Sequence, residues 1–261
     1  MLRGLYSSAT GMKAQELLID VTANNLANVN TNGFKRSQLD FADQLYSTLQ
    51  QAGSEVTAGQ PSPVGLQVGS GVRPTGTTKL FAPGSIEQTN NPLDVAIQGD
   101  GFFQITLPNG GERFTRDGAF RMNAEGTLVT MDGYALTDQV TIPSGAANIN
   151  IGHDGTVSFT DDTGETQSAG QITLVRFPNP AGLSSEGGNL YARTVASGDP
   201  VAGQPGESGA GTLIGGQLER SNVEVVTELI SLITAQRAYE INSRAIRAGD
   251  EMLSTTTDIV R

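Results

Sequence analysis

The sequence predicts an α+β fold: N- and C-terminal coiled-coil-forming helices packed together, with an inserted, mainly antiparallel β domain and an extended β arm. Three observations lead to this prediction. Apolar residues recur at every seventh position near both ends of the chain, and the middle alternates short apolar runs with turn residues. The composition combines 33 glycines with only 5% aromatic residues, which favours short strands and tight turns over a bundle of helices.

The two predicted helices are defined by heptad stripes, because seven-residue spacing keeps one side of a helix facing a partner helix. The second helix is expected at about residues 222–257, with Ser221 and Asn222 as N-cap residues. The alternative is that two amphipathic helices cover one globular core. Apolar residues off the stripes, such as Leu17 and Ile230, favour contacts with other chains instead, since a helix that is apolar on several sides needs several neighbours. The stripes are Leu5, Met12, Ile19 and Leu26, and then Val225, Leu232, Tyr239, Ile246 and Leu253.

The middle of the chain carries the pattern of an antiparallel β domain. The runs LDVAI, GFFQITL, GTLVT and QITLVRF predict strands, because they are short, apolar and rich in β-branched or aromatic residues. Asp-Gly pairs begin at Asp100, Asp117, Asp132 and Asp154, and they predict two-residue hairpin turns in which both central residues have positive φ.

The chain is therefore expected to leave through one helix, build the β domain and return through the other. The predicted terminal helical domain comprises residues 1–36 and 217–261. The predicted connecting arm comprises residues 37–79 and about 202–216, which are rich in Gly, Pro and Ser. The antiparallel β domain is expected at residues 80–201.

Composition argues against several classes of function. With a net charge of −11 and only three lysines, the chain has no basic face for nucleic acid. It has no cysteine, and its one histidine, His153, precedes an Asp-Gly turn, so neither a metal site nor a cofactor is expected. The phosphate-binding, dinucleotide-binding and nucleophile-elbow motifs are missing, so we expect no enzyme. No apolar run is long enough for a membrane span, and the N-terminus lacks the apolar segment typical of a Sec signal peptide.

Three stretches resemble one known family. ANNLANVNTNGFKRS (23–37) and QRAYEINSRA (236–245) are similar to the two terminal signatures of the axial proteins of the bacterial flagellum, the rod and hook family. TNNPLDVAIQGDGFFQITLPNG (89–110) and FTRDGAF (114–120) are similar to the β domain of that family. The chain length and the stretch GLQVGSGVRP (65–74) most resemble the distal-rod branch. The alternatives are a hook or proximal rod protein and, from another class, a secreted enzyme or binding module that acts on the cell wall.

The resemblance implies a structural subunit of the distal rod, which assembles helically into the rigid drive shaft that transmits torque from motor to hook. The implied location is the flagellar basal body, in the periplasm and through the outer-membrane ring, after export without a cleaved signal peptide. The implied partners are further copies of the chain, proximal rod and hook proteins, P and L ring proteins, the rod cap and the flagellar type III export apparatus. Nucleic acid and direct membrane insertion are not expected.

Two sets of residues are the candidate functional residues. The predicted self-assembly seam consists of the two heptad stripes and asparagines that would fix one register through mutual hydrogen bonds. The alternative is that residues Asn28 to Asn32 form only a helix cap and turn, as expected for Asn30 and for Asn32-Gly33 at the helix end. The seam asparagines are Asn24, Asn25, Asn28 and Asn242. The residues of the arm that are expected to stiffen the rod are Gly65, Leu66, Val68, Gly69, Gly71, Val72, Arg73 and Pro74.

Overall fold

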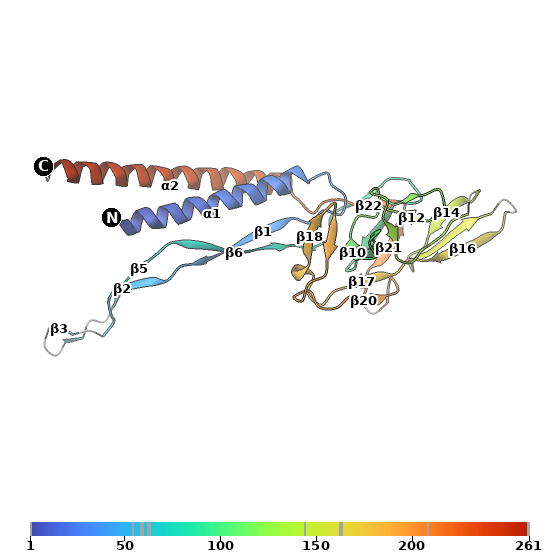
Figure 1. Cartoon of the computed structure of the whole chain (residues 1–261), viewed down its shortest axis with the longest axis horizontal. Helices are drawn as coiled ribbons and strands as arrows, with labels where there is room; N and C mark the ends of the chain where they lie inside the picture. Colours follow the sequence, from blue (N-terminus) through green and yellow to red (C-terminus); the bar gives the residue numbers. More distant parts are fainter. Residues whose placement is uncertain are drawn as a thin grey trace. The chain divides into compact units, whose positions relative to one another are not determined.

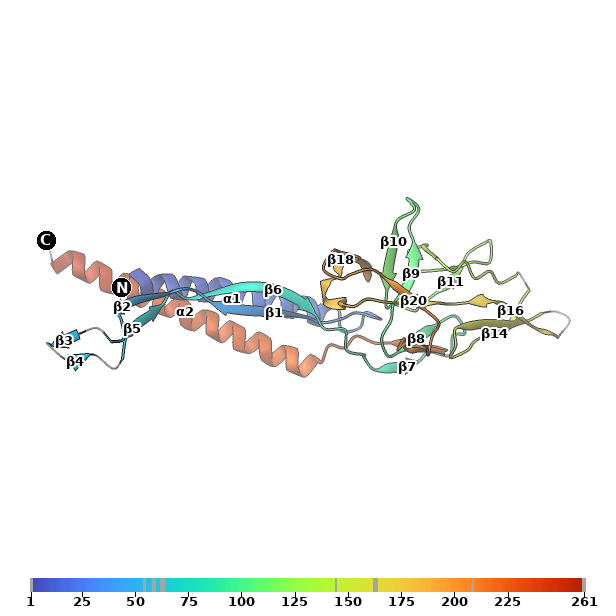
Figure 2. The ribbon, with the colours of Figure 1, turned by 90° about the horizontal axis from the view of Figure 1, so that it is seen from below.

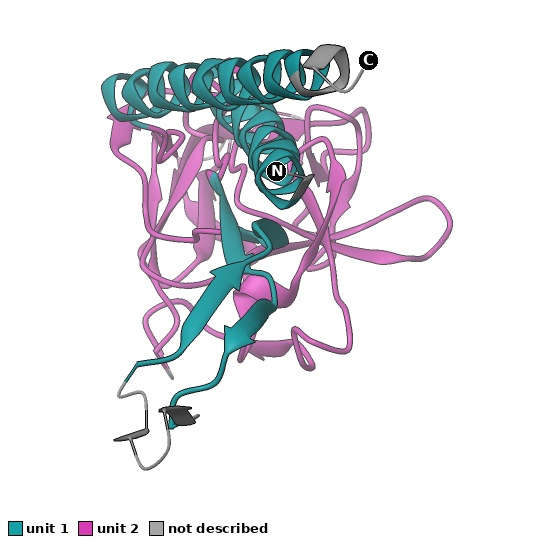
Figure 3. Cartoon of the chain, turned by 90° about the vertical axis from the view of Figure 1, so that its left-hand side faces the viewer, with its two compact units in different colours: residues 1–26, 37–78, 224–261 teal, residues 27–36, 79–223 magenta. Residues whose placement is uncertain are grey.

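Two long helices lie near the ends of the chain, α1 at Leu2–Ala27 and α2 at Val225–Ile259 (Figure 1). The remaining elements are almost all strands in mostly antiparallel sheets, which confirms the predicted α+β class. The computed structural model describes residues 2–53, 55–57, 60–61, 64–143, 145–161, 164–207 and 209–259. The chain divides into unit 1, residues 1–26, 37–78 and 224–261, and unit 2, residues 27–36 and 79–223 (Figure 3).

The start of α2 differs from the sequence prediction. The helix begins at Val225, and the Thr227 hydroxyl donates a 2.9 Å hydrogen bond to the Glu224 carboxylate in its first turn. The predicted cap residue Asn222 instead donates from its amide to the backbone oxygens of Leu80 and Ala82, at 2.8 and 3.0 Å. The prediction that Ser221 and Asn222 cap α2 was therefore wrong, because the Asn222 amide binds the backbone of residues 80–82 instead.

The first helix ends at Ala27, several residues before the predicted Asn32-Gly33. A turn follows at once: the Thr31 hydroxyl donates to the Asn28 side-chain oxygen at 3.1 Å, and the Thr31 backbone N–H donates to the Asn28 carbonyl at 3.2 Å. Gly33 has a φ of +65°, in the left-handed region that glycine tolerates. Asn32 does not have a positive φ, although the sequence predicted that it could. The asparagines after Ala27 thus belong to turns rather than to helix.

The strands of unit 1 form three pairs. Within this unit, α1 and α2 run in opposite directions, and the strands β1 (Ser37–Asp43) and β6 (Val72–Lys79) lie along α1 (Figure 2). The Val72 backbone N–H donates to the Thr10 hydroxyl at 3.4 Å, which links a strand to α1. The pairs are β1 (Ser37–Asp43) with β6 (Val72–Lys79), β2 (Tyr46–Gln50) with β5 (Leu66–Gly69), and β3 (Glu55–Thr57) with β4 (Gln60–Pro61), the last two antiparallel.

Unit 2 contains a seven-stranded sheet, a three-stranded sheet and three two-stranded pairings, all antiparallel. The seven-stranded sheet has the order β11 (Arg121–Met122), β12 (Leu128–Val129), β13 (Ala135–Leu136), β9 (Phe103–Thr106), β10 (Glu112–Thr115), β19 (Leu190–Ala192), β18 (Ser184–Gly187). The others are β14 (Ala147–Ile151), β15 (Thr156–Thr160) and β16 (Thr166–Gln171); β17 (Leu174–Arg176) with β20 (Val201–Gly203); β21 (Thr212–Gly215) with β8 (Val95–Gln98); and β22 (Gln217–Glu219) with β7 (Ile86–Gln88). A short 3₁₀ helix, η1, occupies Pro180–Gly182.

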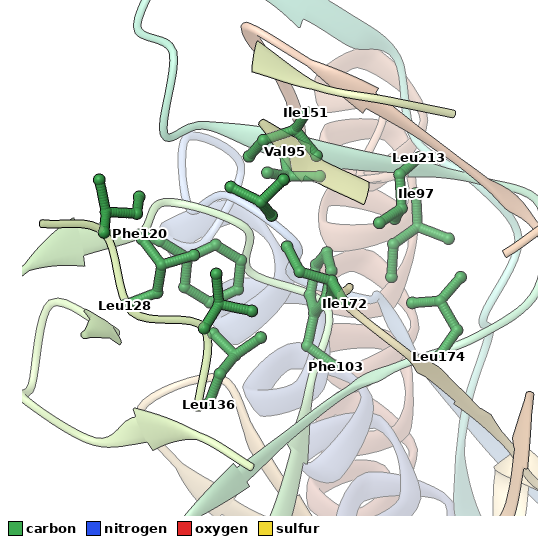
Figure 4. Packing of buried hydrophobic residues seen from close by; sticks show 13 residues of the cluster. Val95, Ile97, Phe103, Phe120, Leu128, Leu136, Ile151, Ile172, Leu174 and Leu213 are labelled. Carbon is green, nitrogen blue, oxygen red and sulfur yellow. The ribbon is translucent and has the colours of Figure 1, made fainter. Parts of the chain in front are cut away.

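The core of unit 2 is built from the strands that the sequence predicted. Each of the four predicted runs contains a strand, namely β8, β9, β12 and β17. Val95, Phe103, Leu128 and Leu174 come one from each run and are buried together (Figure 4). Burying such side chains contributes on the order of 2 kcal/mol each, so this cluster fixes the register of the strands.

The predicted two-residue hairpin turns were wrong in their details. Asp132-Gly133 and Asp154-Gly155 do connect paired strands, but only the glycine has positive φ, at +85° in both turns. The Thr130 N–H bonds the Tyr134 carbonyl across the first turn, which makes the loop longer than two residues. The Asp-Gly motifs at Asp100 and Asp117 connect strands that are not hydrogen-bonded to each other.

One segment of the predicted arm packs differently from expectation. Within residues 202–216, β20 pairs with β17 and β21 pairs with β8. Leu213 of β21 is completely buried in the core of unit 2. This stretch looks polar in sequence because its glycines outnumber its apolar residues, yet one buried leucine holds it in the sheet.

Candidate assembly surfaces

The two helices of unit 1 approach each other in one antiparallel register. A Cβ placed on Gly249 would lie 2.4 Å from a methyl carbon of Leu5, and a Cβ placed on Gly11 would lie 3.0 Å from the Asn242 side-chain nitrogen. At the other end of α1, the Asn25 amide lies 3.3 Å from the Glu228 carboxylate. The residue numbers in each of these pairs add to 253 or 254, as expected when two helices run antiparallel without a slip in register.

The α2 side of this contact has its own seven-residue repeat. Glu228, Ala235, Asn242 and Gly249 face α1, and three of these four positions are buried. The repeat consists of small and polar residues, which allow the helix backbones to come close together. The sequence prediction missed it because a heptad search looks for large apolar residues.

The predicted stripe of α2 lies at the edge of this contact rather than at its centre, whereas Leu5 of the α1 stripe packs against Gly249. Val225 and Tyr239 are 40% and 42% exposed. Within a single chain, α2 therefore presents a large apolar surface that α1 does not cover. Further exposed apolar residues of α2 are Val226, Leu229, Ile230, Ile233, Ile241 and Met252. The remaining stripe residues, all partly buried, are Leu5, Met12, Ile19, Leu26, Leu232, Ile246 and Leu253.

The seam asparagines occupy three different environments. Asn25 is buried, and its amide exchanges two 2.8 Å hydrogen bonds with the backbone of Ser37 in addition to its contact with Glu228. Asn24 is exposed on α1, and Asn28 accepts from Thr31 in the turn that follows the helix. The polar groups of Asn25 thus bind within the chain, and the role of the asparagines between subunits stays a prediction.

The predicted stiffening residues lie in strands β5 and β6 of unit 1 or directly next to them. Gly71 has a φ of +108°, and a Cβ there would lie 2.2 Å from the Thr10 hydroxyl oxygen, so only glycine fits against α1. A Cβ on Gly65 would meet backbone atoms of Gln50 and Ala52 at 2.9 Å. Exposed apolar side chains lie on the same strands. They are Tyr46, Leu49, Leu66 and Val68. Val72, Arg73 and Pro74 form the first residues of β6, and Gly69 pairs with Tyr46 in the β2–β5 ladder.

Unit 2 contains a buried ionic cluster that the sequence analysis did not identify. The Lys35 ammonium donates to Glu219 at 2.5 Å and to the Ala82 carbonyl at 2.9 Å, and both charged side chains are almost fully buried. The Arg116 guanidinium lies 3.7 Å from the other Glu219 oxygen. Burial lowers the pKa of Lys35, while the Glu219 carboxylate acts in the opposite direction. Lysine, arginine and glutamate usually lie at the surface, and no sequence pattern marks these three as exceptions.

Comparisons with known proteins identify the family. Three family models match: "Flagella basal body rod protein" over residues 5–35, "Flagellar hook protein FlgE/F/G D1 domain" over residues 96–159, and "Flagellar basal body rod FlgEFG protein C-terminal" over residues 214–259. The flagellar basal-body rod protein FlgG of Buchnera aphidicola subsp. Schizaphis graminum is 47% identical over 99% of this chain and 100% of its own length. This chain belongs to the FlgG family of flagellar basal-body rod proteins.

Other members of the family are similar over the same extent. The FlgG proteins of Borreliella burgdorferi and Caulobacter vibrioides are 44% and 43% identical, over 100% and 99% of this chain and 100% and 99% of their own lengths. The chain is accordingly a structural component of the flagellar basal body, in a family that is not a family of enzymes.

Among the described residues, neither helix is both long and apolar enough to cross a membrane. Within the same residues, no three His, Cys, Asp or Glu side chains gather as they would around a metal ion.

Proposed function

We propose that copies of this chain assemble helically into the distal part of the flagellar rod, and that the rod transmits torque from motor to hook. The observation that carries the proposal is the uncovered apolar surface of α2, which one α1 helix leaves exposed. Burial of such a surface drives association at about 25 cal/mol per Å². A contact that repeats head to tail without closing gives a filament.

In this proposal the terminal helices of neighbouring subunits pack as coiled coils. The exposed residues of α2 contact α1 or α2 of adjacent copies, and the heptad stripes at the edge of the intrachain contact continue into those interfaces. The proposed helical core lies within residues 1–36 and 217–261, the proposed arm comprises residues 37–79, and the proposed β domain comprises residues 80–201 together with the paired segment 202–216. The exposed side chains of the arm, such as Leu66 at 54% exposure, support contacts of this arm with a neighbouring copy, which would stiffen the rod.

The proposed partners follow from a place in the rod between motor and hook. They are proximal rod and hook proteins at the two ends, P and L ring proteins around the rod, the rod cap during growth and the flagellar type III apparatus for export. The proposed location is the periplasm and the passage through the outer-membrane ring, after export without a cleaved signal.

Electron microscopy of basal bodies from cells without this gene tests the proposal. A stunted rod without a hook is the expected result, whereas a complete rod that lacks only the hook would show that the chain acts beyond the rod.

The helical contact is tested separately with Ile233→Glu, because Ile233 is an exposed apolar residue of α2. Gln236→Glu is the matched control, since it adds the same charge at an exposed polar position of the same helix. We expect rods with the control and none with Ile233→Glu.

A further inference from the structure

Two segments of unit 2 that lie far apart in the sequence are bound to each other, one that follows α1 and one that precedes α2. The Gly33 backbone N–H donates to the Glu219 carbonyl at 2.8 Å, and the Lys35 ammonium donates to the Glu219 carboxylate at 2.5 Å. The Arg36 backbone N–H adds a third link, to the Asn222 side-chain oxygen at 2.8 Å. We call the three residues Gly33, Lys35 and Glu219 the clasp.

The rest of unit 2 holds the clasp in place. Lys35 and Glu219 are 0% and 2% exposed, and the Glu219 Oε1 atom also accepts from the Gly84 backbone N–H at 2.9 Å. A Cβ on Gly33 would lie 2.7 Å from a backbone carbon of Arg116, so this segment has no room to shift toward that side. Moving either segment along the other would leave several buried polar groups without partners, which is costly.

Connections of equal length join the clasp to the two helices. Residues 28–32 lie between the end of α1 and Gly33, and residues 220–224 lie between Glu219 and the start of α2. The residue numbers of Lys35 and Glu219 add to 254, and those of the contacts between the helices add to 253 or 254. The clasp therefore continues the register in which α1 and α2 meet.

The contact between the helices restricts a slip by seven residues only weakly. The small and polar residues of α2 that face α1 recur every seven residues, so such a slip brings a similar face opposite α1. Gly4 precedes Gly11 by seven positions, and it could take the place of Gly11 beside Asn242. The polar contact between Asn25 and Glu228 is 3.3 Å long, beyond the usual range of about 2.7–3.2 Å, whereas the clasp bonds are 2.5 and 2.8 Å.

A slip would also have to be taken up by the connections to the clasp. Seven residues correspond to about 10 Å along a helix, at about 1.5 Å per residue. Residues 28–32 contain a turn that is closed by the bonds from Thr31 to Asn28, which keeps this connection short. With the clasp closed, the slip would require this turn to open. With the clasp broken, the segments around Lys35 and Glu219 would be free to move instead.

We propose that the clasp sets the register of the two helices, because it fixes the points from which the chain extends into α1 and α2. Lys35 and Glu219 are then positioning residues for the helix contact, although both lie outside the helices. A buried ion pair often adds little stability over apolar residues of similar size, but it requires one particular partner, which suits this role. The proposal concerns a single chain, so it does not depend on the proposed function.

Disulfide cross-linking of the purified full-length chain reads the register directly, because the chain has no cysteine of its own. Gly11→Cys with Asn242→Cys reports the present register, since a Cβ on Gly11 would lie 3.0 Å from the Asn242 side chain. Gly4→Cys and Leu18→Cys, each combined with Asn242→Cys, report a slip by seven residues in either direction. In the present register these positions are about 10 Å from the contact, too far for a disulfide. Mass spectrometry of the monomer identifies the disulfides within one chain, and we expect only the first pair to form them.

Lys35→Met together with Glu219→Gln removes the ionic half of the clasp. The double variant leaves no buried carboxylate unpaired, and the net charge of the cluster with Arg116 stays the same. We expect the slipped cross-links to increase at least tenfold over the wild-type background. Arg193→Met with Asp199→Asn is the matched control, because it removes an exposed ion pair of 3.5 Å without changing the net charge. The control should form only the cross-link of the present register.

An insertion keeps the test decisive if the double variant does not fold. Seven Gly and Ser residues placed between Val223 and Glu224 leave every residue of the clasp unchanged and lengthen the connection to α2. We expect the slipped cross-links to appear here as well. The proposal is overturned by cross-links of the present register alone in either folded variant, by equal slipping in the control, or by a first pair that does not cross-link in the wild-type background. The first of these results would assign the register to the helix contact itself.

Discussion

The side-chain amide of Asn25 lies 3.3 Å from a carboxylate oxygen of Glu228, 203 positions further along the chain, and both side chains are buried. The same amide exchanges two 2.8 Å hydrogen bonds with the backbone of Ser37. One asparagine therefore joins α1, α2 and β1 within unit 1. An amide suits this position because it offers donors and an acceptor together, without a charge of its own.

Asn25→Asp should destabilise the packing of unit 1 by about 3 kcal/mol or more, because it removes two donors and places a second carboxylate next to Glu228. The urea dependence of far-UV circular dichroism measures the loss. Asn24→Asp is the matched control, since it makes the same change at the adjacent, exposed position. We expect the control to stay within about 0.5 kcal/mol of the wild-type chain. Equal effects of the two variants would show that Asn25 does not join the three elements.

Gly249→Leu should prevent the close approach of α1 and α2. A Cβ at this position would lie 2.4 Å from one methyl carbon of Leu5 and 3.3 Å from its Cγ. Overpacking of this kind costs about 1–3 kcal/mol, which outweighs the gain in helix propensity of up to about 1 kcal/mol. The number of complete rods seen by electron microscopy measures the effect. Gly4→Leu is the control, because a Cβ there meets nothing within 4 Å. Rods as frequent with Gly249→Leu as with Gly4→Leu would contradict the contact.

Gly71→Val should separate the paired strands of unit 1 from α1. Gly71 has a φ of +108°, and an added Cβ would lie 2.2 Å from the Thr10 hydroxyl oxygen. A β-branched residue with such a φ costs on the order of 1–3 kcal/mol before the clash is counted. Limited proteolysis between residues 44 and 78 should become faster. Gly76→Val, in strand β6 that begins directly after Gly71 and with nothing near its added Cβ, should be cut at the wild-type rate. An unchanged rate for Gly71→Val would mean that the strands do not depend on this contact.

Lys35→Met should unfold unit 2 more easily, because it leaves Glu219 buried without its lysine partner. Removing one member of a buried pair typically costs about 3–5 kcal/mol. The stability of the variant against urea measures this loss. Arg193→Met removes a cation from an exposed pair, so it should change stability by less than about 1 kcal/mol. A loss for Lys35→Met as small as that of the control would show that Glu219 finds another partner.

The sequence predicts the parts of this fold that depend on local patterns. The helices at both ends follow from seven-residue repeats, and the strand containing Val95 follows from a continuous apolar run. What it does not predict depends on contacts between distant segments. Asn222 has the sequence pattern of a helix cap, but its amide donates to the Leu80 carbonyl. Nothing in the local sequence shows that Gly249 lies against Leu5.

The same limit applies to the candidate site. The sequence points to the asparagines and the large apolar residues of α2, yet nothing in the local pattern distinguishes Asn25, which is buried, from Asn24, which is exposed. The ionic cluster around Glu219 brings together residues from three separate parts of the chain. Only the folded arrangement shows that these charges are buried.

Tyr191 gives the stability of unit 2 a defined dependence on alkaline pH. Burial raises the pKa of its hydroxyl from 10.0 to about 12. Between these values the unfolded chain has lost the proton while the folded chain still holds it, so the folded state binds more protons and its stability falls as the pH rises. The contribution is fully present below pH 10 and is lost by about pH 12. Two pKa units correspond to about 2.7 kcal/mol.

Urea unfolding at a series of alkaline pH values, compared between the wild-type chain and Tyr191→Phe, measures this loss. The phenylalanine variant keeps the ring but cannot ionise, so its stability should fall by about 2 kcal/mol less than that of the wild-type chain between pH 10 and 12. The lowered pKa of Lys35 changes the stability with pH in the opposite direction to Tyr191. The unfolded chain then binds more protons than the folded chain, so stability rises with pH up to 10.5. Both chains contain Lys35, so its effect cancels in the comparison. Tyr46→Phe, at a tyrosine that is 56% exposed, is the control and should follow the wild-type curve. Parallel curves for the wild-type chain and Tyr191→Phe would mean that the Tyr191 hydroxyl ionises equally well in the folded and unfolded states.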